Sequence, residues 1–80
     1  MTETQKKVVC ALTGHWATNG DIARIVGITP KAVHQTLTKM IGGGVEYSIV
    51  GSPYNPYMAG LKERGSLIPK KMGFFIWRLS

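Results

Sequence analysis

The chain has 80 residues, of which 44% are hydrophobic and 18% are charged. This length allows one small domain, which excludes a multidomain enzyme or a channel, and the hydrophobic fraction excludes a disordered tail. Ten Lys and Arg residues face four Asp and Glu residues, giving a net charge of +6. Such an excess indicates nucleic acid or another polyanion as the partner, and so few acidic groups argue against an enzyme.

The first predicted helix runs from Thr4 to about His15. Its apolar residues recur at helical spacing and predict one buried face: Val8, Val9, Ala11, Leu12 and Trp16. Cys10 is expected to be a small buried residue of this helix. Lys6 and Lys7 fall near the start of the helix, the unfavourable end of its dipole for a cation.

The second predicted helix begins at Thr18. Thr18 and Asp21 have the T-x-x-D spacing of a capping box, and Gly27 suits the left-handed residue that ends a helix. Two turns of helix would not persist alone in water, so this segment must pack against its neighbours.

The third predicted helix spans Thr29–Ile41. Thr29 is a good N-cap and Pro30 fits the first helical position. An apolar side is expected to be buried: Val33, Leu37, Met40 and Ile41. With the tight turn at Gly27, the two helices form a helix-turn-helix over residues 18–41.

After three glycines, Gly42–Gly44, the period changes. Val45–Val50 and Gly73–Leu79 both read as strands. The connection between them is unusually long. It contains either a short helix that starts at Asn55-Pro56 and ends before Gly65, or an extra strand over Tyr57–Leu61. The last strand is apolar on both faces, so this loop or a second subunit must cover one of them.

The stretch NGDIARIVGITPKAVHQTLTKM resembles the winged helix-turn-helix family of prokaryotic transcription regulators, especially the small single-domain regulators of bacteria, phages and plasmids. The resemblance implies an α+β fold in which three helices precede a β-hairpin wing with an elongated loop. One domain would cover residues 1–80, with the helix-turn-helix at about 18–41 and the wing at about 45–79. The long loop from Gly51 to Lys71 departs from the shorter wing of many members.

The side of the third helix opposite its apolar side predicts a DNA-binding face. Lys31, Gln35 and Lys39 recur there at i, i+4 and i+8 without an acidic residue. A helix fits the major groove, where glutamine can read adenine, lysine can read guanine and alanine can contact the thymine methyl group. We therefore expect Lys31, Ala32 and Gln35 to contact base edges.

The remaining expected contacts are to the DNA backbone. Near the helix-turn-helix they are Thr18, Thr38 and Lys39, and in the wing loop they are Lys62, Arg64, Lys70 and Lys71. The resemblance places the wing along the backbone or in the minor groove, and Arg64 is the candidate for insertion there. The partner is double-stranded DNA. A homodimer and copies lying side by side on DNA both remain open.

Other interpretations of these residues compete with DNA binding. The lysine-and-glutamine side of the third helix could be an ordinary solvated face, and His15 and His34 read as packing or surface residues. A winged helix can also be a protein-interaction module, for example a phage protein that binds a host protein, but it would need no basic stripe. Cys10 and the two histidines lack metal spacing, so no catalytic residue, metal or cofactor is expected.

A cytoplasmic protein associated with the nucleoid is the expected setting. One cysteine excludes an internal disulfide and fits a reducing compartment. No signal peptide is recognisable, and no stretch approaches the roughly 20 apolar residues that span a bilayer.

Overall fold

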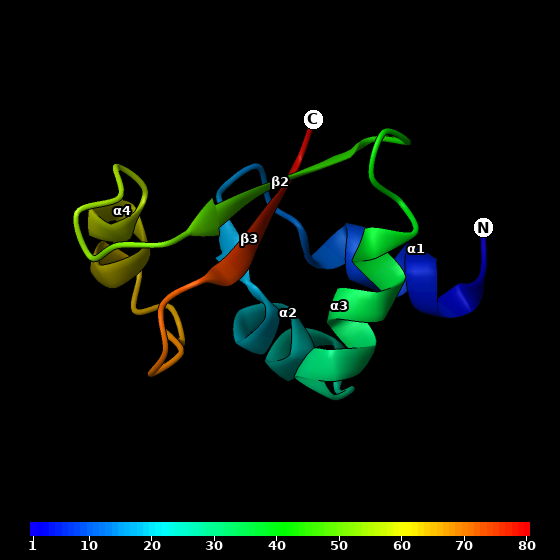
Figure 1. Ribbon diagram of the computed structural model, residues 1–80. Coiled ribbons are helices and arrows are strands. Elements are labelled where there is room, and N and C mark those ends of the chain that lie inside the picture. The colour runs from blue at the N-terminus through cyan, green and yellow to red at the C-terminus, as the bar shows by residue number, and fades with distance from the viewer.

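The structure, a computed structural model, describes residues 1–80 and contains four helices and a three-stranded antiparallel sheet (Figure 1). The elements in chain order are α1 (Glu3–Ala11), β1 (Ala17–Thr18), α2 (Asn19–Val26), α3 (Pro30–Thr38), β2 (Val45–Val50), α4 (Met58–Glu63) and β3 (Phe74–Leu79). The strand order is β1-β3-β2, so β3 lies in the middle. The α+β class is therefore confirmed, with one helix and one strand more than expected.

Helix α1 is shorter than predicted. Thr2 caps it through a capping box with Gln5, and the helix ends at Ala11 rather than at His15. Gly14 adopts a positive φ of 82° in the turn that follows, which directs the chain from the helix into β1. The prediction of a buried Cys10 is wrong, because its side chain lies on the solvent side of α1.

Helices α2 and α3 begin at the predicted caps. Thr18 accepts a hydrogen bond from the Asp21 N–H, and Thr29 accepts one from the Ala32 N–H. Gly27 has a φ of 85°, which a residue with a β-carbon rarely adopts. The three-residue turn between α2 and α3 is therefore as tight as the sequence indicated.

The end of α3 differs from the expectation. The helix stops at Thr38, and the Met40 N–H donates to the Leu37 carbonyl oxygen at 2.9 Å, which tightens the chain into a turn. Met40 stays buried, but Ile41 leaves the core and is exposed. The prediction of a buried Ile41 is therefore wrong.

Two apolar clusters hold the fold together. The larger one joins α1, α2 and α3 to one face of the sheet through β-strand residues such as Val45 and Trp77. The smaller one joins the opposite face, at Val50 and Ile76, to Met58 and Leu61 of α4. The long connection between β2 and β3 thus folds back as a short helix and itself covers the second face of β3.

Strand β1 was not predicted. Only two residues long, it pairs through Ala17 with Trp77 and through Thr18 with Ile76. A strand of two residues is too short to show an alternating pattern in the sequence. It forms because one edge of β3 is not paired with β2 and can hydrogen-bond to it. It ties the start of α2 directly to the sheet.

Candidate nucleic-acid interface

The outward side of α3 is open to solvent. Lys31, Gln35 and Lys39 are all exposed, whereas Val33 and Leu37 on the opposite side are fully buried. A shallow hollow runs along this surface and is lined by His34, Gln35, Thr38 and Lys39. We call the surface formed by Lys31, Ala32, Gln35, Thr38 and Lys39 the α3 face.

No carboxylate belongs to the α3 face. Helix α3 contains no Asp or Glu, and Asp21 of the preceding helix α2 is only 7% exposed. Glu46 is paired with Arg78 on the strands. The positive charge of Lys31 and Lys39 is therefore not offset by an acidic partner on the helix.

Two residues of the α3 face are less free than their neighbours. Ala32 is half-buried, so only part of its methyl group is accessible. The Thr38 hydroxyl donates to the His34 carbonyl oxygen at 2.7 Å, and it must release that bond before it can donate to a phosphate. Lys31, Gln35 and Lys39 carry no such internal contact and are the free polar groups of this surface.

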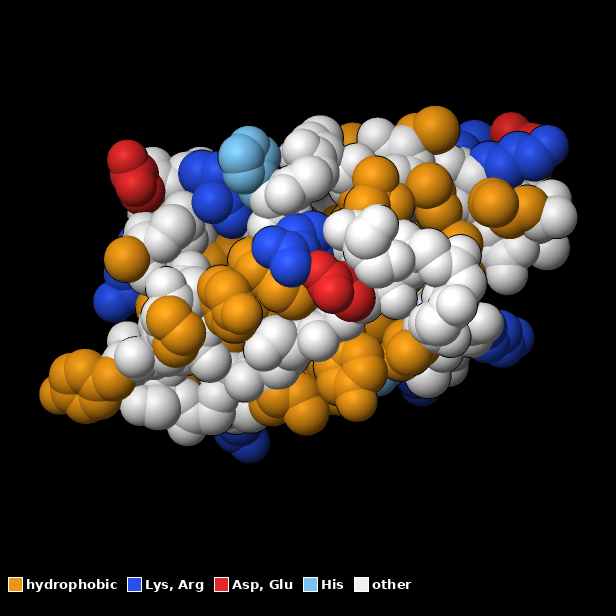
Figure 2. All heavy atoms as spheres, turned by 90° about the horizontal axis from the view of Figure 1, so that it is seen from above, with side chains coloured by type: hydrophobic (Ala, Val, Ile, Leu, Met, Phe, Trp, Pro, Cys, Tyr) orange, Lys and Arg blue, Asp and Glu red, His pale blue; other side chains and the backbone are white.

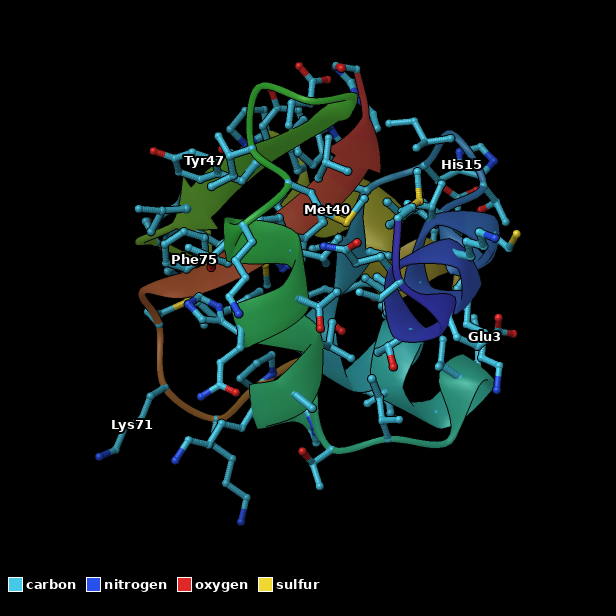
Figure 3. The ribbon with its side chains drawn as sticks, turned by 90° about the vertical axis from the view of Figure 1, so that its right-hand side faces the viewer. Glu3, His15, Met40, Tyr47, Lys71 and Phe75 are labelled. Atoms are coloured by element: carbon cyan, nitrogen blue, oxygen red, sulfur yellow. The ribbon has the colours of Figure 1, made fainter.

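The basic residues of the β2–β3 connection do not form one cluster. Lys70 and Lys71 lie exposed in the segment that leads into β3, and Figure 3 places Lys71 on the same side of α3 as Phe75. Lys62 belongs to α4, at the end of the molecule away from α1 (Figure 1). Only Lys70 and Lys71 accompany the α3 face, so the prediction of a single basic wing requires correction.

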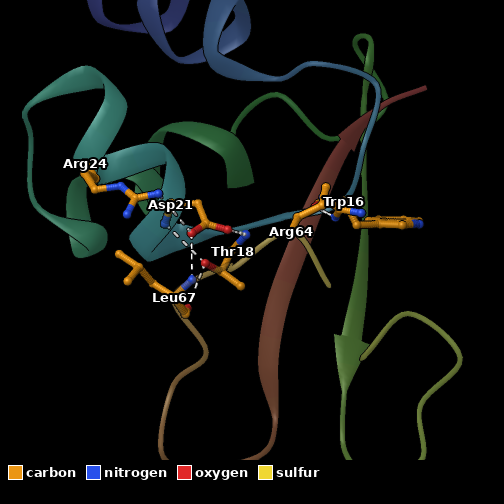
Figure 4. Close-up of polar contacts among 6 residues, drawn as sticks. All are labelled: Trp16, Thr18, Asp21, Arg24, Arg64 and Leu67. Carbon is orange, nitrogen blue, oxygen red and sulfur yellow. Dashed lines mark hydrogen bonds and ion pairs between the residues drawn. The ribbon is translucent and has the colours of Figure 1, made fainter. Parts of the chain in front are cut away.

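Arg64 folds against the protein rather than projecting from it. Its guanidinium Nη2 donates to the carbonyl oxygen of Trp16, just before β1 (Figure 4). This contact holds Arg64 close to the loop between α1 and β1. Its expected role in a minor groove beside α3 does not fit this position.

Thr18 is also unavailable to DNA. Its side chain is 0% exposed, and its hydroxyl donates to the Leu67 carbonyl oxygen at 3.0 Å. The Leu67 N–H in turn donates to Asp21 Oδ1 at 2.7 Å. Thr18, Asp21 and Leu67 therefore form a hydrogen-bonded clasp (Figure 4) that fastens the chain after α4 to the start of α2. We call this the Thr18–Asp21–Leu67 clasp.

Gly20 allows the clasp to close. A β-carbon at this position would lie 3.3 Å from Cβ of Leu67, tighter than most real contacts. The missing side chain thus lets the segment around Leu67 approach the first turn of α2. No local pattern predicts this contact, because its partners lie 46 residues or more apart.

A second buried contact sets the position of α3. The Trp77 Nε1–H donates to Asn19 Oδ1 at 2.6 Å, and Asn19 Nδ2 lies 3.4 Å from His34 Nδ1. The His34 ring also meets Phe75 edge-on, with 4.8 Å between ring centroids. Asn19 therefore links the sheet to the middle of α3, which was not apparent from the sequence, and His34 is a packing residue as expected.

Replacing Asn19 tests this link. Asn19→Leu removes the acceptor of the buried Trp77 Nε1–H, and we expect it to lower the free energy of unfolding by about 1–3 kcal/mol. Asn19→Asp keeps that acceptor and should cost less. Urea denaturation of both variants measures the difference, and equal losses would show that the Trp77 contact is not what Asn19 contributes.

The strands add an aromatic edge beside α3. Tyr47 is 44% exposed and stacks on Phe75, with ring centroids 5.2 Å apart. Ile49, two residues further along β2 on the same face, is exposed as well. The polar α3 face is therefore bordered by an apolar margin.

The face on which the C-terminus lies is mixed in character. Figure 2, seen from the side on which the C-terminus lies, shows hydrophobic side chains interspersed with both positive and negative ones. No group of three or more His, Cys, Asp or Glu side chains is placed to hold a metal ion. None of the four helices has the length and apolar character needed to cross a membrane.

Comparison of the chain with protein-family models, with curated proteins and with solved structures found no match.

Proposed function

We propose that the protein is a winged-helix regulator that binds double-stranded DNA sequence-specifically and controls transcription. The observation that carries this proposal is the α3 face, where Lys31, Gln35 and Lys39 are exposed on a helix whose other side is buried. A capped helix after a tight turn, with a sheet behind it, is the arrangement that presents a helix to the major groove.

The α3 face has the chemistry to read bases and contact phosphates. Gln35 can form two hydrogen bonds with adenine, Lys31 can reach guanine, and the partly exposed methyl group of Ala32 can touch thymine. Lys39 and Thr38 lie further along the helix, where they fit the phosphate backbone. In this role the protein would act in the cytoplasm, on the nucleoid.

The backbone contacts of the β2–β3 connection are reassigned in this proposal. Lys71 is retained, because it is exposed on the side of the molecule where α3 meets Phe75 (Figure 3). Lys70, its exposed neighbour in the chain, is retained with it. Thr18 is left out because it is buried and its hydroxyl donates to Leu67. Arg64 is left out because its bond to the Trp16 carbonyl oxygen holds it beside the loop between α1 and β1, and Lys62 is left out because α4 lies away from α3. In this proposal the β2–β3 connection contacts the DNA backbone only through Lys70 and Lys71, and no part of it enters the minor groove.

Fluorescence anisotropy with a random-sequence duplex at two salt concentrations tests the proposal. Binding through phosphate neutralisation predicts affinity that falls steeply as salt rises. Absent or salt-independent binding would overturn it.

Two single replacements separate base reading from backbone binding. Gln35→Ala should weaken binding to a selected cognate duplex by about 1–3 kcal/mol and relax base preference at one position. Lys71→Ala should weaken binding to all duplexes alike, because a phosphate contact carries no base information. Anisotropy on cognate and scrambled duplexes makes the comparison, and identical behaviour of the two variants on every sequence would contradict the assignment of Gln35.

The second candidate function is a winged-helix protein-interaction module. The aromatic edge favours it, since Tyr47 and Ile49 leave apolar surface exposed beside α3. Such a module would bind its partner with little dependence on salt. If this second function holds, the double variant Tyr47→Ser with Ile49→Ser should abolish binding of the partner protein. The same variant should bind duplex DNA normally, because DNA binding through α3 needs neither side chain.

A further inference from the structure

A groove lies between α1 and α2, apart from the α3 face. It consists of two adjoining hollows of about 440 and 170 Å³ that share Ala11 and Ile25. Ile25 is 62% exposed and lines both hollows, so its side chain is accessible to a partner. Val26 and Cys10 extend this apolar floor.

The rim of the groove is basic. Lys6 and Lys7 line the larger hollow, and Arg24 and Arg64 line the smaller one together with His15. Arg64 is held in place by its bond to the Trp16 carbonyl oxygen, which leaves other guanidinium N–H groups free to bind a carboxylate.

Only two acids line the same groove. Asp21 is only 7% exposed and accepts the Leu67 N–H within the clasp, while lying 4.0 Å from Arg24. Glu3 is exposed at one end, beside Lys6 and Lys7. Four Lys and Arg side chains therefore outnumber the carboxylates around an apolar floor.

We infer that this groove binds an acidic peptide segment of a partner protein, with a large apolar side chain seated on Ile25. Carboxylates on either side of that anchor would meet Lys6 and Lys7 at one end and Arg24 and Arg64 at the other. A second copy of the chain is a poor occupant because its net charge is +6. The complementarity of charge thus selects the class of partner.

The groove and the α3 face lie on opposite sides of the molecule. Figure 3 shows Glu3 and His15, which line the groove, on the side away from Phe75 and Lys71. A peptide in the groove would leave α3 free. The inference therefore stands independently of the DNA proposal, and each can fail without the other.

The test uses the full chain and a fluorescein-labelled probe peptide of Asp and Glu with leucine at every third or fourth position. One control peptide has serine in place of leucine, and another has Asn and Gln in place of the acids. We expect saturable binding of the probe and at least about tenfold weaker binding of both controls, because apolar anchor and charges act together.

Matched variants locate the site. Ile25→Glu and the pair Lys6→Glu with Lys7→Glu should each weaken probe binding at least about tenfold. Tyr54→Glu, at a 92% exposed position away from the groove, and the pair Lys70→Glu with Lys71→Glu are the controls and should leave it unchanged. Circular dichroism verifies that each variant folds.

Three results would overturn the inference: no binding of the probe, equal losses from the two lysine pairs, or displacement of the probe by a short duplex DNA. Equal losses from the two lysine pairs would mean that the probe is attracted only by the overall charge of the protein. Displacement by duplex DNA would mean that the groove contacts DNA. Anisotropy of duplex DNA binding by Ile25→Glu is measured in parallel and should equal that of the unaltered protein, and a loss would likewise make the groove a DNA contact.

Discussion

Replacing Lys31 and Lys39 together by glutamate is expected to remove most of the affinity for duplex DNA. Both side chains are exposed on the α3 face, and no acid on the helix already offsets them. Each lysine that neutralises a phosphate contributes about one unit to the salt dependence of binding, so the slope should fall by about two units or more. Stability should change little, because neither side chain packs in the core.

The matched control is Lys6→Glu with Lys7→Glu. This variant has the same change in net charge, but its substitutions lie on α1, in the groove on the other side of the molecule. It should retain nearly all of the duplex affinity at physiological salt. Anisotropy titrations of both variants over a range of salt concentrations make the comparison. Equal losses would mean that the chain attracts DNA only through its overall charge.

Replacing Asp21 by alanine is expected to be the most damaging polar substitution in the protein. The Asp21 carboxylate accepts the N–H groups of Leu67 and Thr18, and it completes the capping box of α2. Thr18 still caps the helix in this variant, but the N–H groups of Leu67 and Thr18 lose their acceptor, and an unpaired N–H in a partly buried site costs about 1–3 kcal/mol. A chain of this length has about 4–12 kcal/mol of stability in total, so the variant should unfold readily.

Asp21→Asn provides the control for this prediction. Its amide oxygen can still accept the Leu67 N–H, so most of the clasp is preserved and the loss should be clearly smaller. Urea denaturation gives the free energies of unfolding, and limited proteolysis reports whether residues 66–72 have detached from α2. A well-folded Asp21→Ala protein with the stability of the unaltered chain would show that the clasp is not a structural requirement.

Helices α2 and α3 and the tight turn between them were predictable because their signals are local. A capping threonine, a proline at the first helical position and a glycine at the turn each act within a few residues. The spacing of Val33, Leu37 and Met40 then orients α3 and hence places Lys31 and Gln35 outside. The end of α3 was predicted at Ile41 because three glycines follow it, but the helix already ends at Thr38. No residue type near Thr38 indicates this earlier end.

The misplaced residues share a different cause. Thr18 was expected both to cap α2 and to contact a phosphate. It does cap the helix, but its hydroxyl donates to the carbonyl oxygen of Leu67, 49 residues away in the chain. Asn19 meets Trp77 across 58 residues, and no local pattern announces either contact. Arg64 was assigned to the wing from its place in a basic loop, whereas the formation of α4 carries it back to Trp16. Long-range packing decides these roles.

The central claim is that α3 presents its lysine-and-glutamine side to DNA. The most direct measurement is a titration of the isotopically labelled protein with a short duplex, followed by amide NMR shifts. The proposal predicts that the largest shifts fall on Lys31, Gln35 and Lys39, with smaller ones at Lys70 and Lys71, while Lys6, Lys7 and Ile25 stay unchanged. Shifts confined to the α1–α2 groove or to the aromatic edge at Tyr47, or no shifts at a saturating duplex concentration, would contradict it.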